Sequence, residues 1–140
     1  MRSKQWYTKA SRRPKSWVND AGAKLVALAR QRLPRSASHF WVANAWEGTP
    51  PRRFRYVYSL HDCVPPTLLP AYIRRLMARY LERDGTLIMG AYGSTSRQHP
   101  ARDVASHIAA AGFHVAGSRA CGTLPVTRVA WIRAEHRCSS

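Results

Sequence analysis

Hydrophobic residues along the chain recur at helical spacing in three segments. The apolar positions of residues 25–33 return every three or four residues, which predicts a helix. A second set over residues 68–81 predicts an amphipathic helix, and Asp84-Gly85 is typical of a left-handed cap at its end. A third helix is expected through residues 104–111, where Gly112 would end it.

Between these helices lie short runs rich in aromatic and β-branched residues, which predict strands. They cover residues 17–20, 39–43, 54–60, 86–91, 113–117 and 126–132. The order is strand, helix, strand, strand, helix, strand, helix, strand, strand, which favours an α/β sheet with helices on its faces. The short connection through Gly122 and Pro125 predicts that the last two strands are antiparallel neighbours.

The length and composition indicate one globular domain. The chain has 140 residues, of which 45% are hydrophobic, enough for one core. Residues 1–15 hold six basic side chains and no acid, so we expect a disordered leader there. We place the domain at residues 16–135 and a short tail at 136–140.

The charge balance is strongly basic. Lys and Arg number 23 against 7 Asp and Glu, a formal net charge of +16. Such a surface attracts polyanions, and non-specific binding of nucleic acid is one interpretation. Because Arg is spread along the chain, the alternative interpretation is a general bias in composition.

The three cysteines, Cys63, Cys121 and Cys138, have no CxxC spacing. This pattern favours neither a zinc site nor a disulfide framework, so we expect reduced thiols, no metal and a cytoplasmic protein. No apolar run approaches the roughly 18 residues that a membrane-spanning helix needs, and no apolar signal segment follows the basic start.

Four strings, in their order and spacing, resemble the class I, Rossmann-like methyltransferases that use S-adenosylmethionine. The likeness covers about residues 17–134, through NDAGAKLVALARQRLP, FWVANAWEGTPPRRFRYVYSLHDCVPP, LERDGTLIMGAYG and AAAGFHVAG. It implies a mostly parallel sheet that ends in an antiparallel pair, the sixth and seventh strands of the family. It also implies S-adenosylmethionine as cofactor and methyl transfer to an acceptor, which we expect to be a small molecule.

The resemblance assigns cofactor contacts to three residues near the first two strands. Asp20 matches the acid after the family's second strand, whose carboxylate accepts hydrogen bonds from the ribose hydroxyls. Asn44 and Ala45 match the pair that contacts the adenine edge. An N-terminal helix cap is the alternative role for Asp20.

The resemblance also places residues at the end of the family's fourth strand. Ser59 and Leu60 would lie beside the cofactor, since ligands of open α/β sheets bind at the carboxyl ends of strands. His61 is the candidate proton acceptor, and a structural or solvated histidine is its alternative. Tyr92 and His99 are further candidates for contact with the acceptor.

The sequence departs from this family before Asp20. The first glycine is Gly22, so the family's first strand and glycine-rich loop are not found, and the sheet would be incomplete at its N-terminal side. Three outcomes are open: an inactive remnant or truncated product, a smaller closed sheet, or a strand supplied by another chain in an oligomer. Arg55 stands where the family usually has Asp.

Two functions from different classes follow. The first is an S-adenosylmethionine-dependent methyltransferase, and the second is a basic nucleic-acid-binding module on a degenerate Rossmann-like sheet. The second rests on the charge, the basic leader and the aromatic residues Trp6, Tyr7 and Trp17, which could stack on bases. A partner subunit or remnant that binds neither ligand is the third interpretation.

Overall fold

The computed structural model describes residues 18–20, 22–44 and 46–134. The chain divides into two compact units, Met1–Thr49 and Pro50–Ser140. The order of helices and strands along the described residues is the predicted one. The leader and tail predicted at residues 1–15 and 136–140, and the aromatic residues of the leader, lie outside the described residues.

The described residues of the Met1–Thr49 unit form a two-stranded parallel sheet, one α-helix and one 3-10 helix. Its elements are β1 (Val18–Asp20), α1 (Ala23–Arg32), the 3-10 helix η1 (Pro34–His39) and β2 (Phe40–Val42). The Arg30 guanidinium joins helix to sheet, because Nε and Nη2 donate to the Phe40 carbonyl at 3.1 and 2.6 Å. Val26 and Phe40 are buried.

The described residues of the Pro50–Ser140 unit form a four-stranded sheet with two α-helices and two 3-10 helices. Its elements are β3 (Phe54–Leu60), α2 (Leu69–Arg79), β4 (Leu81–Tyr92), α3 (Val104–Ala110), β5 (Gly117–Cys121) and β6 (Thr127–Arg133). The 3-10 helices η2 (His61–Cys63) and η3 (Pro66–Leu68) connect β3 to α2.

The strand order of this sheet is β3-β4-β6-β5. β3 and β4 are parallel, whereas β6 lies antiparallel to both β4 and β5. The antiparallel pairing of the last two strands is therefore confirmed, as is the α/β class with a mixed, Rossmann-like sheet. β4 and β5 follow each other along the chain, but they are not neighbours in the sheet because β6 lies between them.

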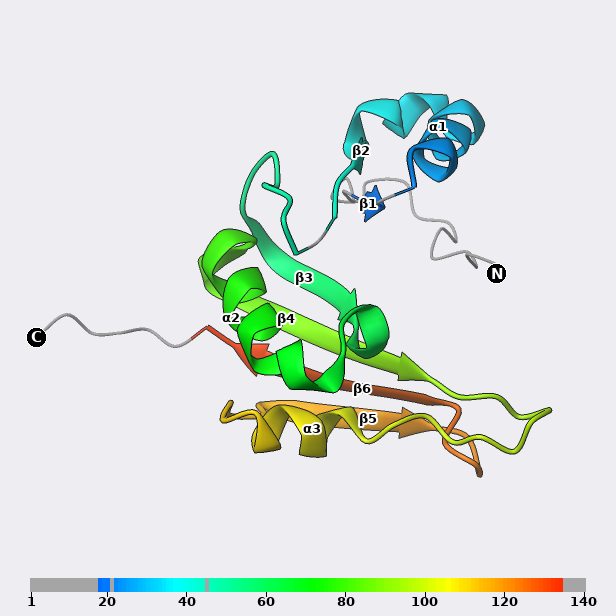
Figure 1. Ribbon diagram of the computed structural model, residues 1–140, viewed down its shortest axis with the longest axis vertical. Coiled ribbons are helices and arrows are strands. Elements are labelled where there is room, and N and C mark those ends of the chain that lie inside the picture. Colours follow the sequence, from blue (N-terminus) through cyan, green and yellow to red (C-terminus); the bar gives the residue numbers. More distant parts are fainter. Residues whose placement is uncertain (1–17, 21, 45, 135–140) are drawn as a thin grey trace, which may run out of the picture. The chain divides into compact units, whose positions relative to one another are not determined.

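Helices α2 and α3 cover the same face of this sheet (Figure 1). Alternate residues of β4 and β6 point to that face and are buried, among them Leu87, Met89 and Ile132. From the helices, Ile73 and Ile108 have no exposed surface. The core of the unit therefore lies between one sheet face and the helix pair.

Two sequence predictions within this unit are wrong. Helix α2 ends at Arg79, and Asp84 and Gly85 belong to β4, where Gly85 does not adopt a positive φ. The β3–β4 register shifts between Phe54 and Tyr56, and this irregularity accommodates the longer β4 segment. Because β4 begins at Leu81 and pairs there with Phe54 of β3, the chain at Asp84-Gly85 is extended and does not form the predicted left-handed cap.

The strand predicted at residues 113–117 instead lies at Gly117–Cys121. Gly112 has φ of +92° and ends α3 as predicted. The Phe113 amide still bonds the Ile108 carbonyl at 3.3 Å, so this part of the chain is held to the helix. Sheet pairing starts when the Ala116 amide donates to the Trp131 carbonyl at 2.8 Å.

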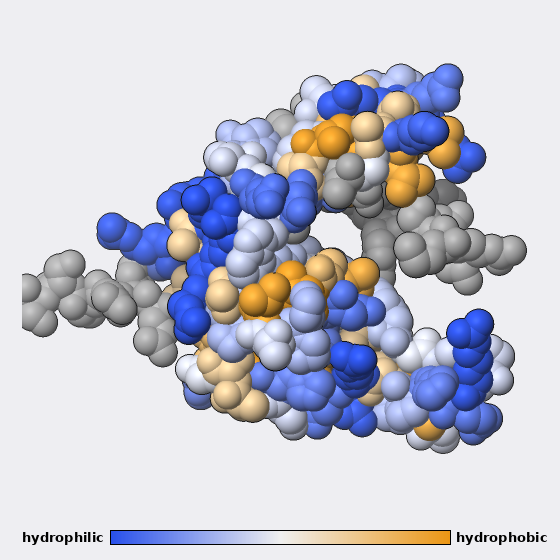
Figure 2. Space-filling model, viewed as in Figure 1, coloured by the Kyte–Doolittle hydropathy of each residue, from blue (hydrophilic) through white to orange (hydrophobic). Residues whose placement is uncertain are grey.

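Hydrophilic residues occupy much of the surface seen in Figure 2, with smaller hydrophobic patches on each unit. Among the described residues, no helix has the length and apolar character needed to cross a membrane.

Candidate functional site

The cofactor residues predicted in the first unit lie at one end of its parallel pair. Asp20 is the last residue of β1 and pairs with Val42, the last residue of β2. Asn44 follows β2 by two residues, so Asp20 and Asn44 lie at the carboxyl ends of adjacent strands. The side chain of Asp20 and all of Ala45 lie outside what the structure describes.

Asn44 organises the turn that leaves β2. Its Oδ1 accepts a hydrogen bond from the Trp46 amide at 2.8 Å, and its carbonyl accepts one from the Gly48 amide at 2.6 Å. Asparagine is favoured in such turns because its side-chain oxygen replaces a backbone acceptor. The exposed side chain is thus oriented by its own loop.

In the second unit, the predicted residues lie where β3 ends. Ser59 points to the covered face, where its hydroxyl lies 2.8 Å from the Tyr72 hydroxyl of α2. Leu60 pairs with Gly90 of β4 and is 36% exposed. Since successive strand residues point to opposite faces, Ser59 and Leu60 face different sides of the sheet.

His61 is 2% exposed and connects the end of β3 to α3. Its Nε2 lies 2.9 Å from His107 Nδ1, and the two ring centroids are 4.9 Å apart. His61 Nδ1 is buried and has no hydrogen-bond partner among the described residues. Burial lowers the pKa of His61 below its usual value, and the neighbouring His107 and Arg102 lower it further, so the ring favours its neutral form.

Tyr72 and His107 are residues that the sequence analysis did not select for this region. Tyr72 is 1% exposed, and burial raises its pKa to about 12. Its place within the apolar pattern of a helix gave no sign of a polar contact. His107 lies one residue before the buried Ile108 and 46 positions after His61, so no local pattern links the two histidines.

The two acceptor candidates differ in their surroundings. Tyr92 ends β4 and its hydroxyl lies 3.1 Å from the Tyr58 hydroxyl. Burial raises the pKa of Tyr58, and its contact with Tyr92 raises it further. His99 is exposed in the loop after β4, where its backbone forms a bridge with Ser94. Their roles toward an acceptor stay predictions.

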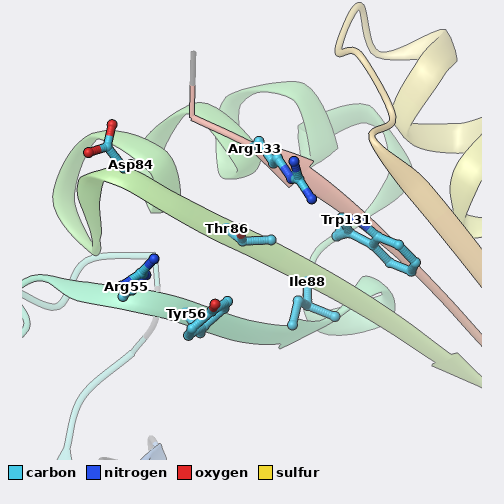
Figure 3. Close-up of a pocket in the computed structure, with 7 residues that line it drawn as sticks. All are labelled: Arg55, Tyr56, Asp84, Thr86, Ile88, Trp131 and Arg133. Carbon is cyan, nitrogen blue, oxygen red and sulfur yellow. The ribbon is translucent and has the colours of Figure 1, made fainter. Parts of the chain in front are cut away.

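A separate open hollow of about 490 Å³ lies on the second unit. Its lining residues come from the neighbouring strands β3, β4 and β6, and Figure 3 shows a helix behind the sheet. The lining residues are Arg55, Tyr56, Asp84, Thr86, Ile88, Trp131 and Arg133. The hollow is therefore on the sheet face that α2 and α3 do not cover. The described residues hold no group of three or more His, Cys, Asp or Glu suited to a metal ion.

No protein-family model matches the sequence, and no curated protein matches it. The fold, however, is similar to solved methyltransferases. One is the N-methyltransferase NodS from Bradyrhizobium japonicum WM9 with S-adenosyl-L-homocysteine, at 16% identity and TM-score 0.60, over 83% of this chain and 64% of that chain. Another is magnesium protoporphyrin IX methyltransferase (ChlM) from Synechocystis PCC 6803 with bound SAM, at 18% identity and TM-score 0.53, over 84% and 58%.

A third is an S-adenosylmethionine-dependent methyltransferase from Clostridium acetobutylicum ATCC 824, at 9% identity and TM-score 0.63, over 86% of this chain and 75% of that chain. These likenesses show that the chain has the class I methyltransferase fold. The chain spans less than two thirds of the NodS complex chain and of ChlM.

Proposed function

We propose that the chain is an S-adenosylmethionine-dependent methyltransferase or a part of one, and that its acceptor is a small molecule. The observation that carries this proposal is the sheet of the second unit, in which antiparallel β6 inserts between β4 and β5. Solved methyltransferases share this fold, and two of them hold S-adenosylhomocysteine or SAM. A small-molecule acceptor is supported by a further solved structure of similar fold (18% identity, TM-score 0.52), the Burkholderia thailandensis 1,6-didemethyltoxoflavin-N1-methyltransferase with bound 1,6-didemethyltoxoflavin.

The first unit supplies the residues that fit the adenosine part of the cofactor. Asp20 and Asn44 occupy one end of a parallel strand pair, where ligands of α/β sheets bind. A carboxylate suits the two ribose hydroxyls, and the turn at Asn44 gives its amide a fixed orientation for a base edge. The resemblance also assigns cofactor contacts to Ala45 of this unit and, within the second unit, to Ser59 and Leu60.

His61 is the proposed proton acceptor in the second unit. The bound cofactor would supply an electrophilic methyl group, so the protein needs to position the acceptor and remove at most one proton. A lowered pKa keeps the His61 ring neutral, as a base must be. In the tautomer whose Nε2–H donates to His107 Nδ1, the bare nitrogen Nδ1 is the one at which a proton would be received.

The sequence before Asp20 does not contain the glycine-rich loop that the resemblance implies. The proposal has two forms: the chain binds the cofactor by itself, or it does so once a further segment of a longer protein or another chain in an oligomer completes the sheet. Both forms require Asp20 to contact the ribose.

Calorimetric titration with S-adenosylhomocysteine tests the proposal. We expect saturable binding that weakens about tenfold or more in Asp20→Ala, because a charge-assisted hydrogen bond contributes about 1.5–3 kcal/mol. Glu47→Ala, which removes another acid of the same unit from an exposed turn, is the matched control and should leave the affinity unchanged.

The two forms are separated by protein concentration. Binding that appears only at concentrations where sedimentation shows an oligomer supports the second form. A folded protein, by circular dichroism, that binds no cofactor at any concentration would contradict the proposal.

A further inference from the structure

The face of the four-stranded sheet opposite α2 and α3 carries a row of large side chains. Tyr58, Ile88 and Trp131 lie directly opposite one another on β3, β4 and β6, and Gly117 of β5 ends the row. Because cross-strand neighbours share a face, these residues form one continuous surface. Next to it, Tyr56 is 65% exposed.

Two glycines make room for aromatic rings on this surface. The ring of Trp131 lies over Gly117, where a Cβ would overlap the indole. Tyr58 likewise lies over Gly90, where a Cβ would overlap the phenol. Glycine within a strand often marks such a close approach. Both rings are therefore supported by backbone on one side.

Arginine side chains surround these rings. Arg55 and Arg133 line the hollow together with Tyr56 and Trp131, and Asp84 is the one acid among its lining residues (Figure 3). Arg119 on β5 pairs with Val129 and so shares the face of Trp131. With a net charge of +16 for the whole chain, this face is suited to a polyanion.

We propose that this face binds single-stranded nucleic acid. Bases would stack on Tyr56, Tyr58 and Trp131, and the phosphates would contact Arg55, Arg119 and Arg133. Aromatic rings on a basic surface are the features that recognise single strands without sequence preference, and an exposed face of a four-stranded sheet provides such a platform in RNA-binding domains. In a duplex the base faces are already stacked, so duplex binds less tightly. This inference goes beyond methyl transfer and does not depend on it.

The test is fluorescence polarisation of the full chain with fluorescein-labelled oligothymidylate and oligouridylate over a range of salt concentrations. The basic residues 1–15 add sequence-independent attraction in every variant, so the aromatic substitutions are decisive. We expect Tyr56→Ala and Trp131→Ala each to weaken binding at least about fivefold, whereas Tyr56→Phe and Trp131→Phe retain a stacking ring and most of the affinity. Substitution of Tyr56 should disturb folding less than substitution of Trp131, because the side chain of Tyr56 is largely exposed and contributes little to the stability of the fold.

The arginines are tested by the salt dependence of binding. The double variant Arg55→Ala/Arg133→Ala should reduce the slope of log affinity against log salt by about 1.4, since each phosphate contact contributes roughly 0.7 for single strands. The matched control is Arg74→Ala/Arg79→Ala, which removes the same charge from exposed positions of α2.

Four results would overturn the proposal, and the first three are no binding at low salt, unchanged affinity in both aromatic variants, or an equal loss of slope in the α2 control. The third would show a general effect of charge. Tighter binding to a duplex of the same length would also overturn it, because rings on an open sheet cannot stack on paired bases.

Discussion

The two units bury apolar side chains to different extents. In the Met1–Thr49 unit, Val26 and Phe40 are the buried apolar side chains of the described residues, while Leu25 is 60% exposed. In the Pro50–Ser140 unit, two helices and the central strands form a continuous core. A parallel pair such as β1–β2 normally lies within a larger, covered sheet. The comparison indicates that the unit with Asp20 and Asn44 has the weaker core of its own.

The largest expected difference is in core substitutions. Leu87→Ala, at a fully buried position of β4, should reduce the free energy of unfolding by about 2–5 kcal/mol. Leu25→Ala, on the exposed side of α1, should change it by less than about 0.5 kcal/mol. Urea denaturation measures the total change in the free energy of unfolding for each variant. Hydrogen exchange by mass spectrometry then shows which unit has lost protection. Equal loss of protection in both units after Leu87→Ala would show that they unfold together.

The next effect concerns pH and is confined to the second unit. Burial lowers the pKa of His61 in the folded state, so between that pKa and the usual value of about 6.5 the unfolded chain binds more protons. Stability is therefore full above pH 6.5 and falls as the pH decreases toward the folded pKa. The change should appear in the urea midpoint between pH 7 and pH 5.

His61→Gln should flatten this pH profile, whereas substitution of the exposed His114 by Gln should leave it unchanged. A wild-type profile that is already flat in this range would contradict a buried, neutral His61.

The smallest expected effects come from helix caps, which also differ between the units. The carboxylate of Asp103 caps α3 by accepting hydrogen bonds from the Ser106 amide and hydroxyl at 3.2 and 2.9 Å. Asp103→Ala should cost about 0.5–2 kcal/mol. Helix α1 begins after Gly22, which has no side chain for this role, so Gly22→Ser should stabilise it by a few tenths of a kcal/mol. Thermal melts of both variants give the two values, and a destabilised Gly22→Ser would show that this position needs glycine.

The sequence predicted the order of elements because each helix and strand has its own hydrophobic period. It misplaced β5, since the apolar run at residues 113–116 precedes the strand, whereas Gly117–Cys121 is poor in β-branched residues. The cap predicted at Asp84-Gly85 was wrong for a related reason. These residues belong to β4 because its pairing with β3 is irregular, and a local sequence pattern does not reveal that pairing.

The candidate site was less predictable than the fold. The residues that the resemblance selected lie at or just after strand ends, but the resemblance did not indicate which way their side chains point. Ser59 faces α2, and His61 contacts a histidine 46 positions away. The sequence also did not predict the aromatic face. Gly90 and Gly117 make room for the rings of Tyr58 and Trp131, and this role can be recognised only when the cross-strand neighbours are known.

The insertion of β6 between β4 and β5 also has a consequence for synthesis on the ribosome. When β5 emerges, the strand that will pair with it has not yet been made, and β4 still has one unpaired edge. A chain that extends from its N-terminus must hold both edges open until residues 127–133 leave the exit tunnel. Exposed strand edges favour aggregation, so the nascent chain is most vulnerable in the interval between β5 and β6.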